Sequence, residues 1–196
     1  MGQLSKKSYV SFVIILIFFS HIPINKTAYM YLKQNGFQEK FPMGQMIVER
    51  AGVAVSSEPS DVIMAKSLGS TLAVVASDPE AGVAGICHCV LPEAGPSGRL
   101  PEMVDQMREL FKYMLQKGAS AKGMKIMLCG AATFLSEPKE MALGVRLYKR
   151  AVKTLTKNGL KVGGEHVGGP LNRSVSIEVG SDTAKVILPD KKEILI

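Results

Sequence analysis

Residues 68–92 read LGSTLAVVASDPEAGVAGICHCVLP and contain two apolar runs, Thr71–Ala76 and Val83–Leu91. Both runs are short, rich in Val, Ile and Ala, and bounded by Gly, Ser or Pro, which is typical of strands buried on both faces. Ser77-Asp78-Pro79 predicts a turn between them. The first strand is entered through a tight corner, Leu68-Gly69-Ser70-Thr71, whose backbone N–H groups could hold an oxyanion.

The segments around this stretch add further strands. Met46–Val55 has a strand-like composition broken at Gly52, and Met124–Cys129 alternates before the small-residue turn Gly130-Ala131-Ala132. In the tail, Gly180-Ser181-Asp182 marks the turn of a predicted hairpin. The remaining predicted strands are Asp61–Ala65, Ser174–Val179 and Ala184–Leu188.

Two longer segments have helical periodicity. The first begins at Pro101 and ends at Gly118, and the second begins after Ser136, a residue that can cap it, with Pro138 just inside, and ends at Gly159. We interpret the apolar face of the first helix as packing on the protein's own sheet rather than on a partner. The apolar faces are Met103, Met107, Leu110 and Met114 in the first helix and Val145, Tyr148, Val152 and Leu155 in the second.

The composition is that of an ordinary globular domain. Of the 196 residues, 46% are apolar and 21% are charged, which excludes a disordered tail, a collagen-like fibre and a disulfide-stapled miniprotein. Three cysteines without a regular spacing favour a reduced, intracellular protein. Many strands with two long helices predict a mixed α/β or α+β fold.

The formal net charge of +7 is unevenly distributed. Residues 1–42 hold five lysines and one glutamate, so the remainder carries only +3. A nucleic-acid-binding domain keeps its charge on the folded part, so we exclude nucleic acid as the main partner. We interpret the basic residues of the second helix as a solvated face that an acidic partner could also use. These residues are Arg146, Lys149, Arg150, Lys153 and Lys157.

Residues 1–42 form a hydrophobic, basic leader, and residues 43–196 form the predicted domain. Lys6 and Lys7 precede the apolar run Val10–Phe19, and hydrophobicity declines through residue 24. A membrane anchor through residues 10–24, a poor signal peptide without an Ala-x-Ala site, and a start codon assigned too far upstream all remain open. We favour the upstream start, so a membrane is a partner only if the leader is translated and retained.

His88 lies between Cys87 and Cys89 in the second buried strand. Successive strand residues point to opposite faces, so His88 cannot share a metal site with either cysteine or activate either thiol. We therefore expect no metal and no cofactor, and interpret these thiols and that of Cys129 as inert core residues. The Gly168–Arg173 segment lacks the Lys and the following helix of a phosphate-binding loop, and a turn is the preferred interpretation.

Five short blocks follow one another within a region that runs from about Ile47 to Val186. They are Leu68-Gly69-Ser70-x-Leu72-Ala73-Val74, Asp78-Pro79, Gly85-x-x-His88-x-x-Leu91-Pro92, Lys125-Ile126-x-x-Cys129-Gly130-Ala131 and Gly168-Gly169-x-x-x-Arg173-x-Val175. Together these blocks resemble the chemoreceptor glutamine deamidase family, CheD. The resemblance implies an α/β sandwich with sheets flanked by two helices.

The same resemblance implies a cytoplasmic enzyme that hydrolyses glutamine side chains of methyl-accepting chemoreceptors to glutamate and ammonia. It also implies a CheC-type phosphatase as a partner. In the family a Cys nucleophile follows the Gly-Ser corner, a His acts as base and an upstream Thr orients it. The corresponding residues here are Thr71, His88 and Ala65, so two of the three positions depart from the pattern. Gly69 and Ser70 become candidates for the oxyanion corner, and Gly168, Gly169 and Arg173 for substrate binding.

Two interpretations follow from these departures. Either the protein is an amidohydrolase that uses Thr71 and His88, or it is an inactive family member that binds chemoreceptors or the CheC phosphatase and regulates by occupancy. A Cys thiol has a free pKa near 8.5, whereas a Thr hydroxyl is far less acidic and must lose its proton during attack. A membrane-tethered binding domain is a third interpretation, and it depends on the leader.

Overall fold

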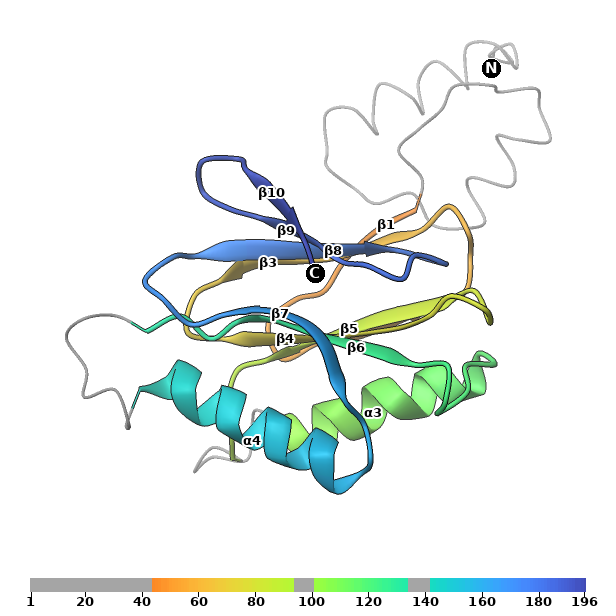
Figure 1. Ribbon diagram of the computed structural model, residues 1–196, viewed down its shortest axis with the longest axis horizontal. Coiled ribbons are helices and arrows are strands. Elements are labelled where there is room, and N and C mark those ends of the chain that lie inside the picture. Colours follow the sequence, from red (N-terminus) through yellow and green to blue (C-terminus); the bar gives the residue numbers. More distant parts are fainter. Residues whose placement is uncertain (1–43, 94–100, 134–141) are drawn as a thin grey trace, which may run out of the picture. The chain divides into compact units, whose positions relative to one another are not determined.

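The computed structural model describes residues 44–93, 101–133 and 142–196, which form two stacked sheets with two helices on the outside of one of them (Figure 1). The central sheet has the strand order β2-β5-β4-β6-β7 and the outer sheet the order β1-β3-β8-β9-β10. Both helices cover the face of the central sheet that points away from the outer sheet (Figure 1). The predicted mixed α/β fold with sheets and two helices is therefore confirmed.

The central sheet is antiparallel except for the β6–β7 pair, which is parallel. All seven residues of β4 and all seven of β5 are buried, as the apolar runs predict, because this sheet is covered on both faces. Its strands are β2 (Val53–Ser56), β4 (Leu72–Asp78), β5 (Val83–Cys89), β6 (Lys125–Gly130) and β7 (Val162–Val167).

The outer sheet contains the predicted tail hairpin, β8 with β9, and pairs it with β3. It also contains β10 beside β9, which the sequence did not predict. The predicted strand-like segment Met46–Val55 is divided between the two sheets, with β1 beside β3 here and β2 in the central sheet. Its strands are β1 (Gln45–Ile47), β3 (Val62–Leu68), β8 (Arg173–Glu178), β9 (Lys185–Ile187) and β10 (Glu193–Leu195).

Two apolar cores hold these layers together. One lies between the two sheets, and the other lies between the central sheet and helices α3 (Met103–Gln116) and α4 (Leu143–Lys157). The predicted face of α3 is confirmed, because each of its four residues is at most 1% exposed. These residues are Met103, Met107, Leu110 and Met114.

The predicted face of α4 is partly wrong. The buried residues are Gly144, Leu147, Ala151 and Leu155, whereas Val145, Tyr148 and Val152 are only half-buried beside them. The helix is rotated toward its small residues because Gly144 packs directly against the Ala131 backbone carbonyl. Ala142 is the N-cap residue, and the predicted cap Ser136 and Pro138 lie outside the described residues.

The predicted turn at Ser77-Asp78-Pro79 begins too early, because β4 continues through Asp78. The Asp78 carboxylate accepts hydrogen bonds from the backbone N–H groups of Ser120 (2.8 Å) and Ala81 (3.2 Å). These bonds satisfy a buried carboxylate and hold its pKa below the ordinary value, the Ser120 bond having the largest effect. A buried strand can therefore end in an ionised residue.

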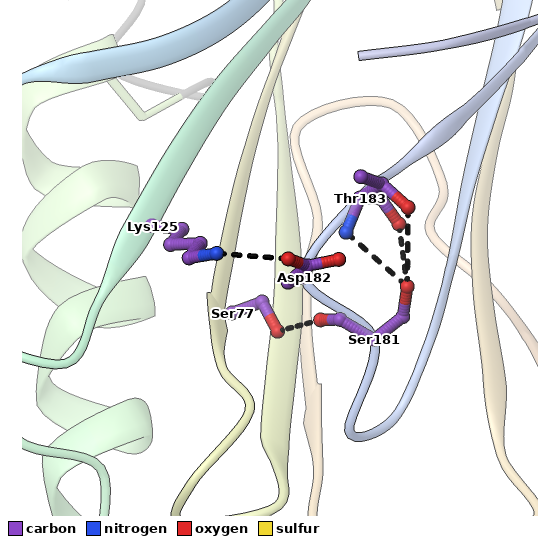
Figure 2. A network of polar contacts seen from close by, with 5 residues as sticks. All are labelled: Ser77, Lys125, Ser181, Asp182 and Thr183. Carbon is purple, nitrogen blue, oxygen red and sulfur yellow. Dashed lines mark hydrogen bonds and ion pairs between the residues drawn. The ribbon is translucent and has the colours of Figure 1, made fainter.

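Polar contacts join the two sheets at the Asp78 end of β4 (Figure 2). Ser77 Oγ donates to the Ser181 carbonyl oxygen at 2.5 Å, and Lys125 Nζ lies 2.9 Å from an Asp182 carboxylate oxygen. Ser181 Oγ in turn donates to the Thr183 carbonyl oxygen at 2.8 Å. The predicted turn at residues 180–182 is thus held against the end of β4 and the start of β6.

In the described part of the chain, no helix has both the length and the apolarity needed to cross a bilayer. The predicted anchor at residues 10–24 lies outside that part, and the division between residues 42 and 43 stays a prediction.

We expect Leu110→Ala to lower the free energy of unfolding by about 2–5 kcal/mol, because Leu110 is fully buried between α3 and the central sheet. Leu115 lies on the same helix but is 52% exposed, so Leu115→Ala serves as the matched control and should change stability by less than about 0.5 kcal/mol. Urea unfolding of the two variants measures both effects. Equal losses would contradict the assignment of the helix-side core.

Candidate active site

Thr71 and His88 meet where β4 begins and β5 ends. Thr71 Oγ1 lies 2.9 Å from His88 Nε2, which is hydrogen-bonding distance. Both side chains are buried, with 6% and 2% of their surface exposed. The two residues singled out as nucleophile and base are therefore in direct contact.

The pairing of β4 with β5 produces this contact. Ala73 lies opposite His88, and Thr71 precedes Ala73 by two residues, so Thr71 lies on the same face of the sheet as His88 and diagonally across from it. Cys87 and Cys89 belong to the helix-side core, which places the intervening His88 on the face toward the outer sheet. The predicted separation of His88 from its cysteine neighbours agrees with this alternation.

Burial keeps the His88 imidazole neutral. Loss of solvent lowers the pKa of His88 below its ordinary value, and the charge of Arg50 lowers it further. The Val48 backbone carbonyl and the charge of Glu49 raise the pKa of His88, but the net shift is still downward. A neutral imidazole can accept a proton from a hydroxyl at Nε2, as a general base must.

The other ring nitrogen, Nδ1, has no hydrogen-bond partner among the described residues, although it is buried. When Nε2 accepts the Thr71 hydrogen bond, the proton resides on Nδ1, and the Val48 backbone carbonyl is the acceptor beside the ring, although the contact falls outside hydrogen-bonding geometry. Ala65, at the position of the family's upstream Thr, faces the same inter-sheet core but has no hydroxyl to offer. The Val48 carbonyl therefore favours a proton on Nδ1, and Ala65 adds no side-chain contact that would hold the ring.

The backbone of His88 is held more firmly than its ring. Its N–H donates to the Gly52 carbonyl oxygen and its carbonyl accepts from the Ala51 N–H, both at 3.0 Å. Gln106 of α3 donates its side-chain N–H to the same carbonyl at 3.1 Å, and its own Oε1 has no partner within the described residues. Gln106 is 1% exposed, a buried polar residue on the helix face toward the sheet that sequence reasoning missed.

The corner before Thr71 is fixed by the turn after β6. The Ala131 N–H donates to the Thr71 carbonyl oxygen at 2.7 Å, and the Ala132 N–H donates to the Gly69 carbonyl oxygen at 2.8 Å. The Gly69 N–H donates to the Ser67 carbonyl oxygen at 3.0 Å, so this N–H is already engaged within the corner. For the N–H groups of Ser70 and Thr71, no acceptor lies among the described residues, which leaves these two as candidate oxyanion donors.

Arg173 holds the loop between β7 and β8. Its guanidinium donates to the carbonyl oxygens of His166 (2.9 Å), Leu171 (2.8 Å) and Gly168, and to His166 Nδ1 at 2.8 Å. The side chain is 4% exposed, so these bonds occupy it within the loop. The substrate-binding role expected for Arg173 stays a prediction, and the contacts described here position the loop.

The two glycines of this loop lie beside the turn after β6. The Gly168 N–H donates to the Gly130 carbonyl oxygen, and the Gly169 carbonyl accepts from the Thr133 N–H, both at 2.9 Å. Both glycines have positive φ angles, 73° and 65°, which other residues rarely adopt. Three separate segments, the corner, the β6 turn and this loop, therefore form one hydrogen-bonded unit around Thr71.

None of the three cysteines supplies a reactive thiolate. All three are buried and none is in a disulfide. Burial raises the pKa of Cys129 to about 12, so its thiol stays protonated at neutral pH even though it shares the inter-sheet core with His88. Cys87 and Cys89 lie 3.6 Å apart, and the hydrogen bond between them and burial hold the pKa of Cys89 well above its ordinary value. The side chain within hydrogen-bonding distance of His88 Nε2 is a hydroxyl, that of Thr71.

Residues 44–93, 101–133 and 142–196 contain no cluster of three or more His, Cys, Asp or Glu side chains that could hold a metal ion.

Comparison with known sequences identifies the protein family to which this chain is related. A family model described as CheD chemotactic sensory transduction matches residues 104–187. The probable chemoreceptor glutamine deamidase CheD 1 of Syntrophus aciditrophicus (strain SB) is 30% identical over 152 residues, which cover 74% of this chain and 94% of that protein. The chain belongs to the CheD family. This membership confirms the resemblance that the five sequence blocks indicate.

Two further CheD relatives have similar coverage. The chemoreceptor glutamine deamidase CheD of Thermotoga maritima is 31% identical and covers 69% of this chain and 85% of its own length. The probable chemoreceptor glutamine deamidase CheD of Solibacter usitatus (strain Ellin6076) is 30% identical and covers 71% of this chain and 86% of its own length. The chain thus spans most of the length of these CheD relatives.

Gly130→Ala should destabilise the fold around the corner. Gly130 has φ = 110°, and an added Cβ would overlap the Thr71 carbonyl oxygen. Gly159 also has a positive φ, 72°, but an added Cβ would meet no atom within 4 Å, so Gly159→Ala is the matched control and should cost about 1–2 kcal/mol. Urea unfolding should show a larger loss for Gly130→Ala. Equal losses would mean that the close approach to Thr71 carries no energetic weight.

Acidification should destabilise the protein between about pH 6.5 and 5. Burial lowers the folded-state pKa of both His88 and His166, so the unfolded chain binds protons more readily as the pH falls through 6.5. Each histidine can change the unfolding free energy by at most about 1.4 kcal/mol per pH unit. We expect a shallower pH slope in His88→Gln than in the native protein. Stability that rises on acidification in this range would contradict the neutral, buried imidazoles.

Proposed function

We propose that this protein deamidates glutamine side chains of chemoreceptors, with Thr71 as the nucleophile and His88 as the general base. The observation that carries the proposal is the 2.9 Å contact between Thr71 Oγ1 and His88 Nε2, in a CheD chain whose His88 is neutral. Relatives in this family are named as chemoreceptor glutamine deamidases, which supports the choice of substrate.

The reaction would proceed in two halves. In the first, His88 Nε2 takes the Thr71 hydroxyl proton while Oγ1 attacks the side-chain carbonyl carbon of the glutamine. The tetrahedral intermediate then releases ammonia, which leaves with the proton returned by His88, and an ester to Thr71 remains. In the second half, His88 takes a proton from water, and the resulting hydroxide attacks the ester. Thr71 Oγ1 departs with that proton, so glutamine and water become glutamate and ammonia.

The negative charge of each tetrahedral intermediate develops on the former carbonyl oxygen. Backbone N–H groups aimed at that oxygen stabilise it without reorganisation. The N–H groups of Ser70 and Thr71 suit this role, because the Gly69 N–H is already bonded to Ser67 within the corner. The bonds from the β6 turn keep the corner in position, which is the preorganisation that such donors need.

A second candidate function is binding without turnover. The alanine at position 65 favours it, because it lacks the hydroxyl that orients the base in the family, and a loosely oriented base activates a weakly acidic hydroxyl poorly. In that case the protein would bind chemoreceptors or a CheC-type phosphatase and regulate them by occupancy. We propose the cytoplasm as the location for either function, because chemoreceptor segments that carry these glutamines must reach the site.

The two candidates are separated by mass spectrometry of a chemoreceptor cytoplasmic fragment incubated with the full-length protein. A Thr-based deamidase converts Gln to Glu, and both Thr71→Ala and His88→Ala abolish the conversion, whereas Thr71→Cys keeps or raises it. Thr183→Ala is the matched control, because it removes the same hydroxyl at an exposed position before β9 and should leave conversion within about threefold.

No conversion by the native protein, together with conversion by Thr71→Cys, would show an intact pocket without its nucleophile and would establish the binding function instead. Conversion that survives in Thr71→Ala would contradict the role of Thr71 in either account. Ala65→Thr tests the orientation argument, and it should raise the rate if the missing hydroxyl limits His88.

A further inference from the structure

One side of α4 carries only positive charge. Its basic residues recur at i, i+3, i+4, i+7 and i+11, so they lie within one narrow stripe opposite the buried face. The 15 residues of α4 include no Asp or Glu. We call this surface the basic stripe, and it consists of Arg146, Lys149, Arg150, Lys153 and Lys157.

The stripe is unfavourable for the isolated protein. Like charges three or four residues apart on a helix repel one another by a few tenths of a kcal/mol per pair. In the described part of the chain, only two stripe residues have acidic partners, Arg146 with Glu93 at 3.8 Å and Arg150 with Glu102 at 3.6 Å. The buried Arg150 Nε has no hydrogen-bond partner there. A negatively charged partner would remove this repulsion.

An apolar groove lies between α3 and the C-terminal half of α4. Its volume is about 720 Å³, and its walls include Met107, Phe111 and Leu115 of α3, and Leu155 of α4. Leu115 is 52% exposed on the wall of this groove. A groove between two helices is the kind of surface that accepts the apolar face of a third helix.

The charges along the groove match those of the stripe. Arg108 and Lys112 are the charged residues among those that line it, and none of the lining residues is acidic. Arg108 is paired with Asp105, which leaves Lys112 on the α3 side and Lys153 and Lys157 of the stripe on the α4 side. A helix seated in this groove would therefore have basic side chains along its flanks.

We propose that the groove and the basic stripe together form a docking surface for an acidic, amphipathic helix of the chemoreceptor substrate. The apolar face of that helix would cover Leu115 and Phe111, and its acidic residues would face the stripe. The choice of a chemoreceptor as the partner rests on the proposed function, whereas the helical, acidic and amphipathic character follows from the groove and the charges.

The docking surface extends toward the candidate active site. The first turn of α4 packs through Gly144 on the Ala131 carbonyl, and the Ala131 N–H is bonded to the Thr71 carbonyl. The stripe runs from Arg146 near that end to Lys157 beside the groove, about 16 Å along the helix axis. A segment bound along α4 would thus hold the rest of the substrate near Thr71 and raise its local concentration there.

The test uses three fluorescent helical peptides with the same leucine face and with Glu, Gln or Lys at every polar position. Binding to the full-length protein is measured by anisotropy at low and high salt. We expect the Glu peptide to bind most tightly, the Gln peptide more weakly and the Lys peptide least, with salt weakening only the Glu peptide. The double variant Lys149→Glu/Lys153→Glu should weaken the Glu peptide by about tenfold without affecting the Gln peptide.

Two controls separate charge from apolar contact. Leu115→Ser should weaken both the Glu and the Gln peptides, because it removes an exposed apolar contact of the groove. Lys191→Glu/Lys192→Glu makes the same charge change at the exposed turn between β9 and β10 of the outer sheet and should leave all three peptides unaffected. Equal binding of the Glu and Lys peptides, or an equal effect of the two double variants, would overturn the proposal.

Binding of duplex DNA or of vesicles containing anionic lipid more tightly than the Glu peptide, with the same dependence on Lys149 and Lys153, would also overturn it. These assays need no turnover, so they remain decisive if the protein proves to be inactive. If it is active, the Lys149→Glu/Lys153→Glu variant should raise KM for the receptor fragment and leave kcat unchanged. A lower kcat would overturn the proposal, because it would mean that the stripe affects the chemical step rather than binding.

Discussion

The antiparallel pairing of β4 with β5 brings Thr71 and His88 together. The register places Ala73 opposite His88, and the alternation of strand side chains then directs His88 toward the outer sheet and its cysteine neighbours toward the helices. A shift of one residue would turn His88 into the helix-side core and bring a thiol to its place. Burial on both faces opposes such a shift. After the shift, the strand residues that now face the helices would face the outer sheet, and the reverse.

The surrounding loops are held to this pair of strands by backbone hydrogen bonds rather than by side chains alone. The corner before Thr71, the turn after β6 and the loop before β8 are joined through Gly69, Ala131 and Gly168. Such a unit suits a site in which two backbone N–H groups must stay aimed at a developing charge. It also explains why glycines and alanines are concentrated here, since a side chain at Gly130 would displace the Thr71 carbonyl.

Much of the fold could be predicted from the sequence because its strongest signals are local. The runs that became β4 and β5, the methionine face of α3 and the tail hairpin each follow from composition and periodicity. The strand β7 was missed because VGGEHV contains two glycines and polar residues, and it forms only by pairing with β6. The three-residue strand β10 was missed because it is too short to show an alternating pattern and forms by pairing with β9.

The candidate site was predictable only in part. His88 and Thr71 follow from their places in the family blocks, but their contact depends on a strand register that composition does not determine. The contacts of Arg173 with the surrounding carbonyl groups could not be predicted, because those groups belong to a loop whose conformation the sequence does not specify. The unsatisfied Nδ1 of His88 is likewise visible only once the core around it is assembled.

The protonation state of His88 tests this account most directly. Nitrogen-15 NMR of the histidine rings, recorded across a pH titration of the full-length protein, reports both the pKa of His88 and the nitrogen that carries its proton. We predict a neutral ring at pH 7, a pKa below that of a free histidine, and an unprotonated Nε2 facing Thr71. A ring that is protonated at pH 7, or one that carries its proton on Nε2, would contradict the assignment of His88 as the base.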